Sequence, residues 1–169
     1  MAGTDRRDGV ALVLVCCVAL VTAGCVAARP PARAAAVAAG PSRLVAAGRY
    51  LAIAQDGNGR LEVDFGRLAG RDRGRLAAAH ADLRDAAATE RRFDRRLLAI
   101  MFPAATERIA RLLFQVNQSR ASLTISAAAS VSLRQLRSFE RRLTAANAPV
   151  EEAVRVIRSQ LGLPPPDTS

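Results

Sequence analysis

Four polar residues fall on or beside the apolar stripes of an alanine- and leucine-rich chain. Asn58, Glu90, Asn117 and Asn147 each lie near the middle of a segment with helical periodicity. If the four segments pack antiparallel, their midpoints meet in one layer at the centre of the core. Burying such groups without partners costs about a few kcal/mol each, so they should hydrogen-bond to one another or to water. Glu90 also needs a cation, and Arg120, one turn from Asn117, is the first candidate.

A central polar layer has two possible uses. Buried asparagines fix the register of packed helices at some cost in stability. The same groups could instead line a small polar cavity that binds a ligand, and an open, hydrated cavity at Asn58 and Asn147 would favour this second use. A dry core with one exposed apolar groove would favour docking of a partner protein. The layer fails to form if the helix ends differ by several residues from those expected.

Signatures of other chemistry are missing from the sequence. His80 is the single histidine, and it lies in an alanine-rich helical stretch without a nucleophile elbow. Glycine-rich phosphate loops and Glu-x-x-His metal pairs do not occur. Cys16 and Cys17 lie in an apolar run near the N-terminus, and no cysteine follows Cys25. The sequence therefore predicts no catalytic residue, no metal site and no cofactor.

Four amphipathic segments must position the polar layer. The periodicity predicts helices over 43–69, 104–128 and 133–161. A further helix is predicted between the first two of these; Asp72 caps its start, and a buried apolar turn at 100–102 ends it. The apolar stripe keeps its register through Gly57, Gly59 and Pro149, so each interruption is placed inside a continuous helix. The alternative for 72–128 is one kinked helix, whose stripe would be left uncovered. We expect an all-α, antiparallel, up-down-up-down four-helix bundle.

The side chains that should face the core follow from these stripes. In the first segment they include Leu44, Ala47, Leu51, Ala54, Leu61, Phe65 and Leu68, and in the third Ile109, Leu112, Leu113, Val116, Leu123 and Ala127. Ser132 and Gln135 have the spacing of a helix-capping box. Acidic residues such as Asp82, Asp85, Glu151 and Glu152 are expected on outward, solvated faces.

The net charge of +10 comes from arginine alone, because the chain contains no lysine. This usage is typical of a high-GC genome. A basic chain could bind nucleic acid, but the interleaved aromatic residues of a single-strand binder are missing. Anionic lipid head groups and wall polymers are the expected counterions.

The N-terminal region has the layout of a secretory signal. Arg6 and Arg7 precede an uncharged apolar run that ends in Ala23, Gly24 and Cys25. Residues 21–25 resemble the lipobox of bacterial lipoproteins, and this resemblance implies lipidation of Cys25 and cleavage before it. It departs from the usual pattern at Thr22, where an aliphatic residue is common. An uncleaved signal anchor remains an alternative because 20 uncharged residues, 9–28, can just span a bilayer; ordinary secretion is another.

The expected organisation follows: a signal peptide over 1–24, a lipidated cysteine with a flexible Ala/Pro/Gly-rich tether over 25–41, the bundle over 42–163 and a polar tail over 164–169. Residues 50–54 (YLAIA), 147–151 (NAPVE) and 162–166 (GLPPP) resemble small alanine-rich lipoproteins of actinobacteria, of uncharacterised function. This resemblance implies an all-helical, exported protein on the outer face of the cell membrane. It implies no activity.

Two functional hypotheses remain open. The first is a non-enzymatic envelope lipoprotein whose tethered bundle binds a protein, a wall polymer or anionic lipid, or has a structural role. The second is a small-ligand sensor or carrier that uses the central polar layer. A membrane contact through the lipid anchor is common to both, nucleic acid is a partner in neither, and the oligomeric state is left open.

Overall fold

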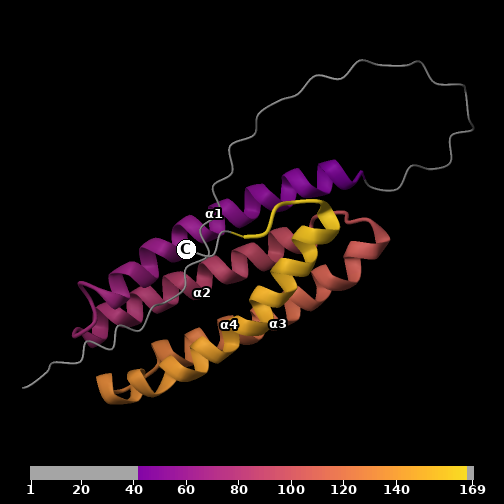
Figure 1. The fold of residues 1–169 in the computed structure, drawn as a ribbon. Helices are drawn as coiled ribbons and strands as arrows, with labels where there is room; N and C mark the ends of the chain where they lie inside the picture. Colours follow the sequence, from indigo (N-terminus) through magenta and orange to yellow (C-terminus); the bar gives the residue numbers. More distant parts are fainter. Residues whose placement is uncertain (1–41, 167–169) are drawn as a thin grey trace, which may run out of the picture.

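Four helices form an antiparallel up-down-up-down bundle, as the sequence predicts (Figure 1). The structure is a computed structural model that describes residues 42–166. The helices are α1 (Arg43–Ala69), α2 (Leu76–Leu98), α3 (Ala104–Ala128) and α4 (Leu133–Leu161), and no strand occurs among the described residues. Each helix packs mainly on the next one in the chain. The expected signal peptide and the tether, which include Cys25, lie outside the described residues.

The helix ends have local causes. The Ser132 hydroxyl accepts a hydrogen bond from the Gln135 backbone N–H at 3.2 Å, and the Gln135 side chain accepts one from the Val131 N–H at 2.8 Å. Gly162 ends α4 in the left-handed conformation, with φ of 73°, where a residue without Cβ is unstrained. α1 continues through its internal glycines, and α4 continues through Pro149, which lies on the exposed side.

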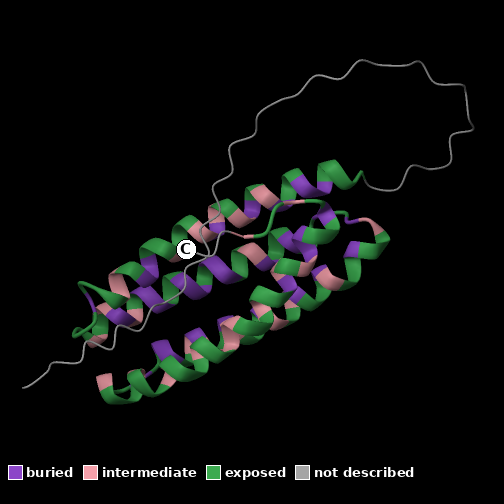
Figure 2. Cartoon of the chain, viewed as in Figure 1, coloured by how far each residue is buried: buried purple, intermediate pink, exposed green. Residues whose placement is uncertain are grey.

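The apolar core consists of two clusters at the two ends of the bundle. Figure 2 marks the buried residues of the four helices in purple. One cluster joins the start of α1 to the end of α2, the start of α3 and the end of α4; Tyr50, Leu97, Leu113, Ile157 and Leu161 belong to it. The other lies near the α1–α2 and α3–α4 turns and contains Phe65, Leu83, Ala86, Ala127 and Ala128. The middle of the bundle is therefore where the apolar packing is interrupted.

The fourth side of the bundle is only partly closed. All buried residues of α4 belong to its C-terminal half, namely Ala153, Ile157, Arg158 and Leu161. α4 thus packs near the start of α1 and diverges from α1 toward Leu133 (Figure 1). We call the line between these two helices the α1–α4 seam. Half-buried apolar side chains of α1, such as Ala54 and Leu61, lie beside it.

Several expectations about burial are wrong. Leu44 is 82% exposed and Leu112 is 46% exposed, although the apolar stripes predict that both face inward. α1 instead buries Tyr50, Ile53 and Gly57, a stripe offset by about one residue. α3 buries smaller side chains, among them Ala110, Ala121 and Thr124. Ala47, Phe65, Leu113 and Ala127 are buried as predicted. The stripes leave out the smaller buried residues because they follow large apolar side chains, whereas small residues allow the closest approach of two helices.

The turns also differ in detail. The apolar turn between α2 and α3 buries Ile100 and Phe102, but Met101 is 69% exposed. Asp72 does not cap α2, which begins three residues beyond the expected start, after Arg75. The Asp72 carboxylate is instead paired with Arg71 and Arg75. Asp82, expected on a solvated face, is buried, for a reason given below.

Candidate functional site

A cavity of about 590 Å³ lies along the α1–α4 seam at the middle of the bundle. Its walls are mainly apolar, and the side chains that form them include Ala54, Leu61, Phe65, Phe93, Leu113, Val150 and Val154. Volumes of about 300–1,000 Å³ and a mostly apolar lining with a few polar groups are typical of small-molecule sites. The cavity exists because α4 does not close against α1 over this part of the bundle.

All five residues of the predicted polar layer line this one cavity. Asn58 comes from α1, Glu90 from α2, Asn117 and Arg120 from α3, and Asn147 from α4. Glu90 and Asn117 are buried, whereas Asn58, Arg120 and Asn147 are half-buried. The layer therefore forms between the two apolar clusters, and it opens toward the seam instead of closing as a dry core.

Glu90 and Arg120 form the ion pair that the sequence analysis expects. Arg120 Nη1 lies 3.1 Å from Glu90 Oε1, with 16% of the Arg120 side chain and 1% of the Glu90 side chain exposed. The contact lacks hydrogen-bond geometry: within residues 42–166, both carboxylate oxygens of Glu90 and the Nε–H of Arg120 have no partner in good hydrogen-bond geometry, although the Thr124 side chain is near enough to Glu90 to lower its pKa. The guanidinium also lies over the Phe65 ring, 5.7 Å from its centroid, an attractive cation–π arrangement.

Asp94, one turn beyond Glu90 on α2, is a buried carboxylate that the sequence analysis missed. Asn117 Nδ2 donates to Asp94 Oδ1 at 2.8 Å and to the Glu90 carbonyl oxygen at 3.4 Å. The amide thus ties α3 to two successive turns of α2. The sequence did contain a signal for this burial. Glu90 and Asp94 are four residues apart and therefore share one side of α2, whereas the two Arg-Arg pairs, 91–92 and 95–96, lie on the other side.

Burial dominates the electrostatics of both carboxylates. It raises the pKa of Glu90 from 4.5 to about 7, against the attraction of Arg120, and the nearby Asp94 raises it further. Burial also raises the pKa of Asp94 from 3.8 to about 6, although the hydrogen bond from Asn117 opposes the shift. Desolvation penalises the charged form of a carboxyl group, so Glu90 at the cavity wall and Asp94 one turn beyond it have pKa values near neutral pH.

The chain beyond α4 returns to the mouth of the cavity, which the sequence did not predict. Arg158, 3% exposed, donates from Nε to the Pro164 carbonyl oxygen at 2.6 Å and from Nη2 to the Pro165 carbonyl oxygen at 3.4 Å. Pro165 and Pro166 contribute to the cavity lining. The segment expected to be a polar tail therefore begins as part of the cavity wall; residues 167–169 lie outside the described residues.

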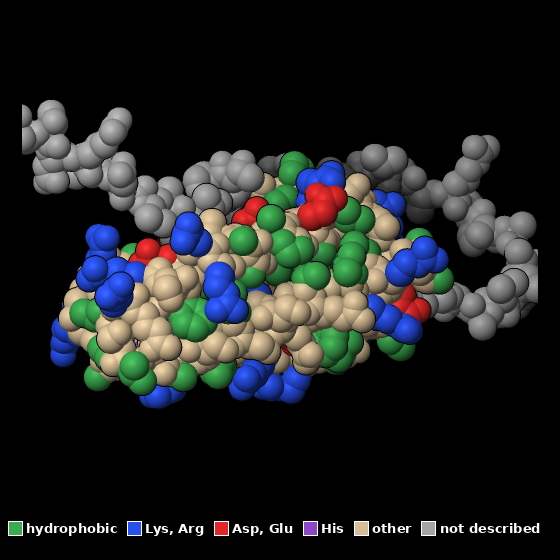
Figure 3. Space-filling view, turned by 90° about the horizontal axis from the view of Figure 1, so that it is seen from below, with side chains coloured by type: hydrophobic (Ala, Val, Ile, Leu, Met, Phe, Trp, Pro, Cys, Tyr) green, Lys and Arg blue, Asp and Glu red, His purple; other side chains and the backbone are tan. Residues whose placement is uncertain are grey.

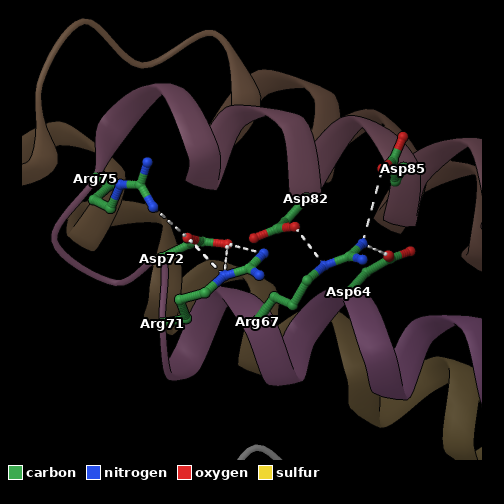
Figure 4. A network of polar contacts seen from close by, with 7 residues as sticks. All are labelled: Asp64, Arg67, Arg71, Asp72, Arg75, Asp82 and Asp85. Carbon is green, nitrogen blue, oxygen red and sulfur yellow. Dashed lines mark hydrogen bonds and ion pairs between the residues drawn. The ribbon is translucent and has the colours of Figure 1, made fainter.

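A second polar network holds the α1–α2 turn (Figure 4). Arg67 of α1 bridges Asp64 of its own helix and Asp82 of α2, at 2.5 and 2.9 Å. Burial raises the pKa of Asp64 and of Asp82, whereas the hydrogen bond from Arg71 lowers the pKa of Asp72. Asp82 is buried because α1 covers it and supplies this arginine. The network lies outside the cavity lining and stabilises the turn.

Possible metal ligands and the position of His80 complete the description of the site within residues 42–166. No group of three or more His, Cys, Asp and Glu side chains that could hold a metal ion occurs there. His80 is half-buried and does not line the cavity. What the described site can do is bind a molecule, because it combines an apolar space with polar groups from all four helices.

On the face that Figure 3 shows, arginine side chains are spread along the molecule and are not gathered into one stripe. Among the described helices, none is long and apolar enough to cross a membrane.

Comparison of the chain with protein-family models, with curated proteins and with solved structures finds no match.

Proposed function

We propose that this chain is a non-enzymatic, exported lipoprotein, tethered through Cys25, whose helical bundle binds a small amphipathic molecule at the α1–α4 seam. The observation that carries the proposal is the cavity, which gathers Asn58, Glu90, Asn117, Arg120 and Asn147 around an apolar space. This observation favours the ligand-binding hypothesis over a layer that only sets helix register.

The state of the polar groups supports the same choice. A layer that serves register alone gains from being closed and fully hydrogen-bonded. Here Glu90 and Arg120 retain hydrogen-bonding capacity that residues 42–166 do not use. Unsatisfied buried polar groups are costly, so these atoms are suited to a molecule that enters from the seam.

The proposed location rests on the sequence of the N-terminal region. Residues 21–25 resemble a lipobox, and the Ala/Pro/Gly-rich residues that follow are suited to a tether. The bundle then begins at α1, so a lipid at Cys25 would hold the domain near the outer face of the membrane. Anionic head groups there would attract its arginine-rich surface.

The test is to fill the cavity without changing the fold. Ala54→Phe places a ring at the half-buried wall of the cavity, and Ala52→Phe places the same ring on the exposed side of α1. Both variants change helix propensity equally. Binding of the neutral apolar fluorophore phenylnaphthylamine should produce saturable fluorescence with the wild type and with Ala52→Phe, and much weaker fluorescence with Ala54→Phe.

Circular dichroism of each variant checks that the helices are retained. Equal binding by both folded variants, or no saturable binding by the wild type, would rule out the cavity as the binding site. An expression form that begins at Ser42 contains the whole described bundle and avoids the signal and tether.

A further inference from the structure

The head-group chemistry of the ligand can be inferred from the ion pair at the inner wall, and this inference rests on the proposed function. Arg120 and Glu90 lie 3.1 Å apart and both line the cavity. An incoming polar head can pair with one of them only by loosening its contact with the other. The question is which member of the pair can be left behind at the lower cost.

The two groups differ in how they can lose their charge. A guanidinium stays protonated at every accessible pH, so displacement of Arg120 from Glu90 by a cation would leave a half-buried positive charge unpaired. A carboxylate can take a proton and become neutral. An anion that displaces Glu90 from Arg120 therefore leaves behind a group that can adapt, and removing one partner from a buried pair is otherwise strongly destabilising.

The remaining arginines of the cavity already have partners. Arg155 donates to Glu152 from Nε at 2.9 Å and from Nη2 at 2.5 Å. Arg158 donates to the carbonyl oxygens of Pro164 and Pro165. The buried Nε–H of Arg120, in contrast, has no hydrogen-bond partner within residues 42–166. Carboxylates and phosphates pair best with adjacent N–H groups of one guanidinium, so Arg120 is the receptor that these residues provide.

We propose that the cavity takes an anionic amphiphile whose head group binds Arg120 in place of Glu90, while its apolar body lies along Phe65, Phe93 and Val154, and that Glu90 takes up one proton as the anion binds. The proton goes to a carboxylate oxygen of Glu90, so that the charge of the site is conserved: one anion and one proton enter together. Carboxylate and phosphate head groups share the required chemistry, and the experiment below separates them.

The electrostatic surroundings of Glu90 agree with this exchange. Its pKa is about 7 in the free bundle because burial outweighs the attraction of Arg120; Asp94 raises the pKa further, and the Thr124 side chain and Arg91 lower it. α1 contributes only neutral side chains to the cavity lining, among them Tyr50 and Asn58. α4 contributes Glu151, Glu152, Arg155 and Arg158. Loss of contact with Arg120 removes an attraction that lowers the pKa, so anion binding favours protonated Glu90.

The experiment uses five ligands that each carry a ten-carbon chain and differ in the head group, each below its micelle concentration, titrated calorimetrically into the chain from Ser42. Decanesulfonate stays anionic at every pH used, decanol is neutral, and decyltrimethylammonium is cationic. Comparing the affinities of decanoate and decyl phosphate shows whether the site prefers a carboxylate or a phosphate head group. Decanesulfonate should bind more tightly than decanol, and the cation more weakly than both.

Proton uptake gives the second readout. Because free Glu90 is ionised above its pKa of about 7, the affinity for decanesulfonate should fall about fiftyfold from pH 7 to pH 9, with a slope that approaches tenfold per pH unit above about pH 8. Titrations in buffers of different ionisation enthalpy should show uptake of about one proton at pH 8. Glu90→Gln should abolish both effects and bind about a hundredfold more tightly than the wild type at pH 9, because it needs no proton.

The double variant with Glu90→Gln and Arg120→Gln is the control, since it removes both charges and keeps a polar side chain at each position. It should still bind decanol and should lose its preference for decanesulfonate. If decanol and decanesulfonate bind the wild type equally, or if the sulfonate binds without proton uptake, the anion exchange is wrong while the proposed cavity function stands. If decanol and phenylnaphthylamine also fail to bind, the proposed function itself is wrong.

Discussion

The Glu90 carboxyl group should make the bundle less stable as the pH rises, and the size of the effect follows from its pKa. The folded value is about 7 and the ordinary value is 4.5, a difference of 7 − 4.5 = 2.5. At 1.36 kcal/mol for each pKa unit, this amounts to roughly 3 kcal/mol. Because the Glu90 side chain is only 1% exposed, solvent screening reduces this figure little.

The sign follows from proton linkage. The folded state binds the proton more tightly than the unfolded state, so the contribution of Glu90 is fully present below pH 4.5 and is lost as the pH rises through about 7. Glu90→Gln cannot ionise and resembles the protonated acid in shape. The variant should therefore match the wild type at pH 4 and exceed its free energy of unfolding by up to about 3 kcal/mol at pH 8.

Urea unfolding followed by circular dichroism, at intervals from pH 4 to pH 8, measures the difference between wild type and variant. Taking the difference removes the contribution of Asp94, whose raised pKa of about 6 gives a slope of the same sign at lower pH. Glu140→Gln, at an exposed position of α4, is the matched control and should show no pH-dependent difference. A Glu90→Gln protein that is less stable than the wild type at pH 8 would refute the reasoning, because the Glu90–Arg120 pair would then be a net stabilising contact.

Three further predictions concern the anchor and the end of α4. The intact mass of protein extracted from membranes should correspond to a chain that begins at Cys25 and carries a diacylglycerol; a chain that still begins at Met1 would instead support an uncleaved anchor. Arg158→Met should destabilise the bundle by about 2 kcal/mol, because it removes charged hydrogen bonds to Pro164 and Pro165. It should also speed amide exchange at Leu163. The control Arg155→Met, at an exposed ion pair, should change stability by less than about 0.5 kcal/mol. Gly162→Ala should cost about 1 kcal/mol in a thermal melt because the position has a φ of 73°, whereas Gly48→Ala, in open space within α1, should stabilise by about 0.5–1 kcal/mol.

Much of the architecture could be predicted because its signals are local. Gly70, Pro103 and Ser132 mark helix boundaries through backbone geometry and capping, which neighbouring residues decide. The polar layer could be predicted because antiparallel helices of similar length bring their midpoints together. That argument places Glu90 and Asn117 at the same height whatever the detailed packing, and the pair with Arg120 follows from the cost of a buried charge.

The rest depends on how helices are rotated and spaced, which a stripe of apolar residues does not determine. One residue of offset turns a helix face by about 100°, so Asp94 and Asp82 could not be assigned partners until α2 was seen against α3 and α1. The apolar stripe of α1 that includes Ala54 and Leu61 is predicted to be covered. It is only half-buried because it faces the seam, and the distance between α1 and α4 is a property of the whole bundle.

The chain order of the helix contacts has a consequence for folding kinetics. The extensive packing joins α1 to α2, α2 to α3 and α3 to α4, so most contacts link residues that are near one another in sequence. Chains with such short-range contacts close small loops first and fold fast, typically in about microseconds to milliseconds. Each pair of consecutive helices can form as soon as both helices are present. The seam joins the first helix to the last, so it can close after these pairs have formed, without any of them coming apart. The seam should accordingly be the part of the bundle that opens at the lowest free energy, so that the cavity can exchange its contents while the three consecutive helix pairs stay folded.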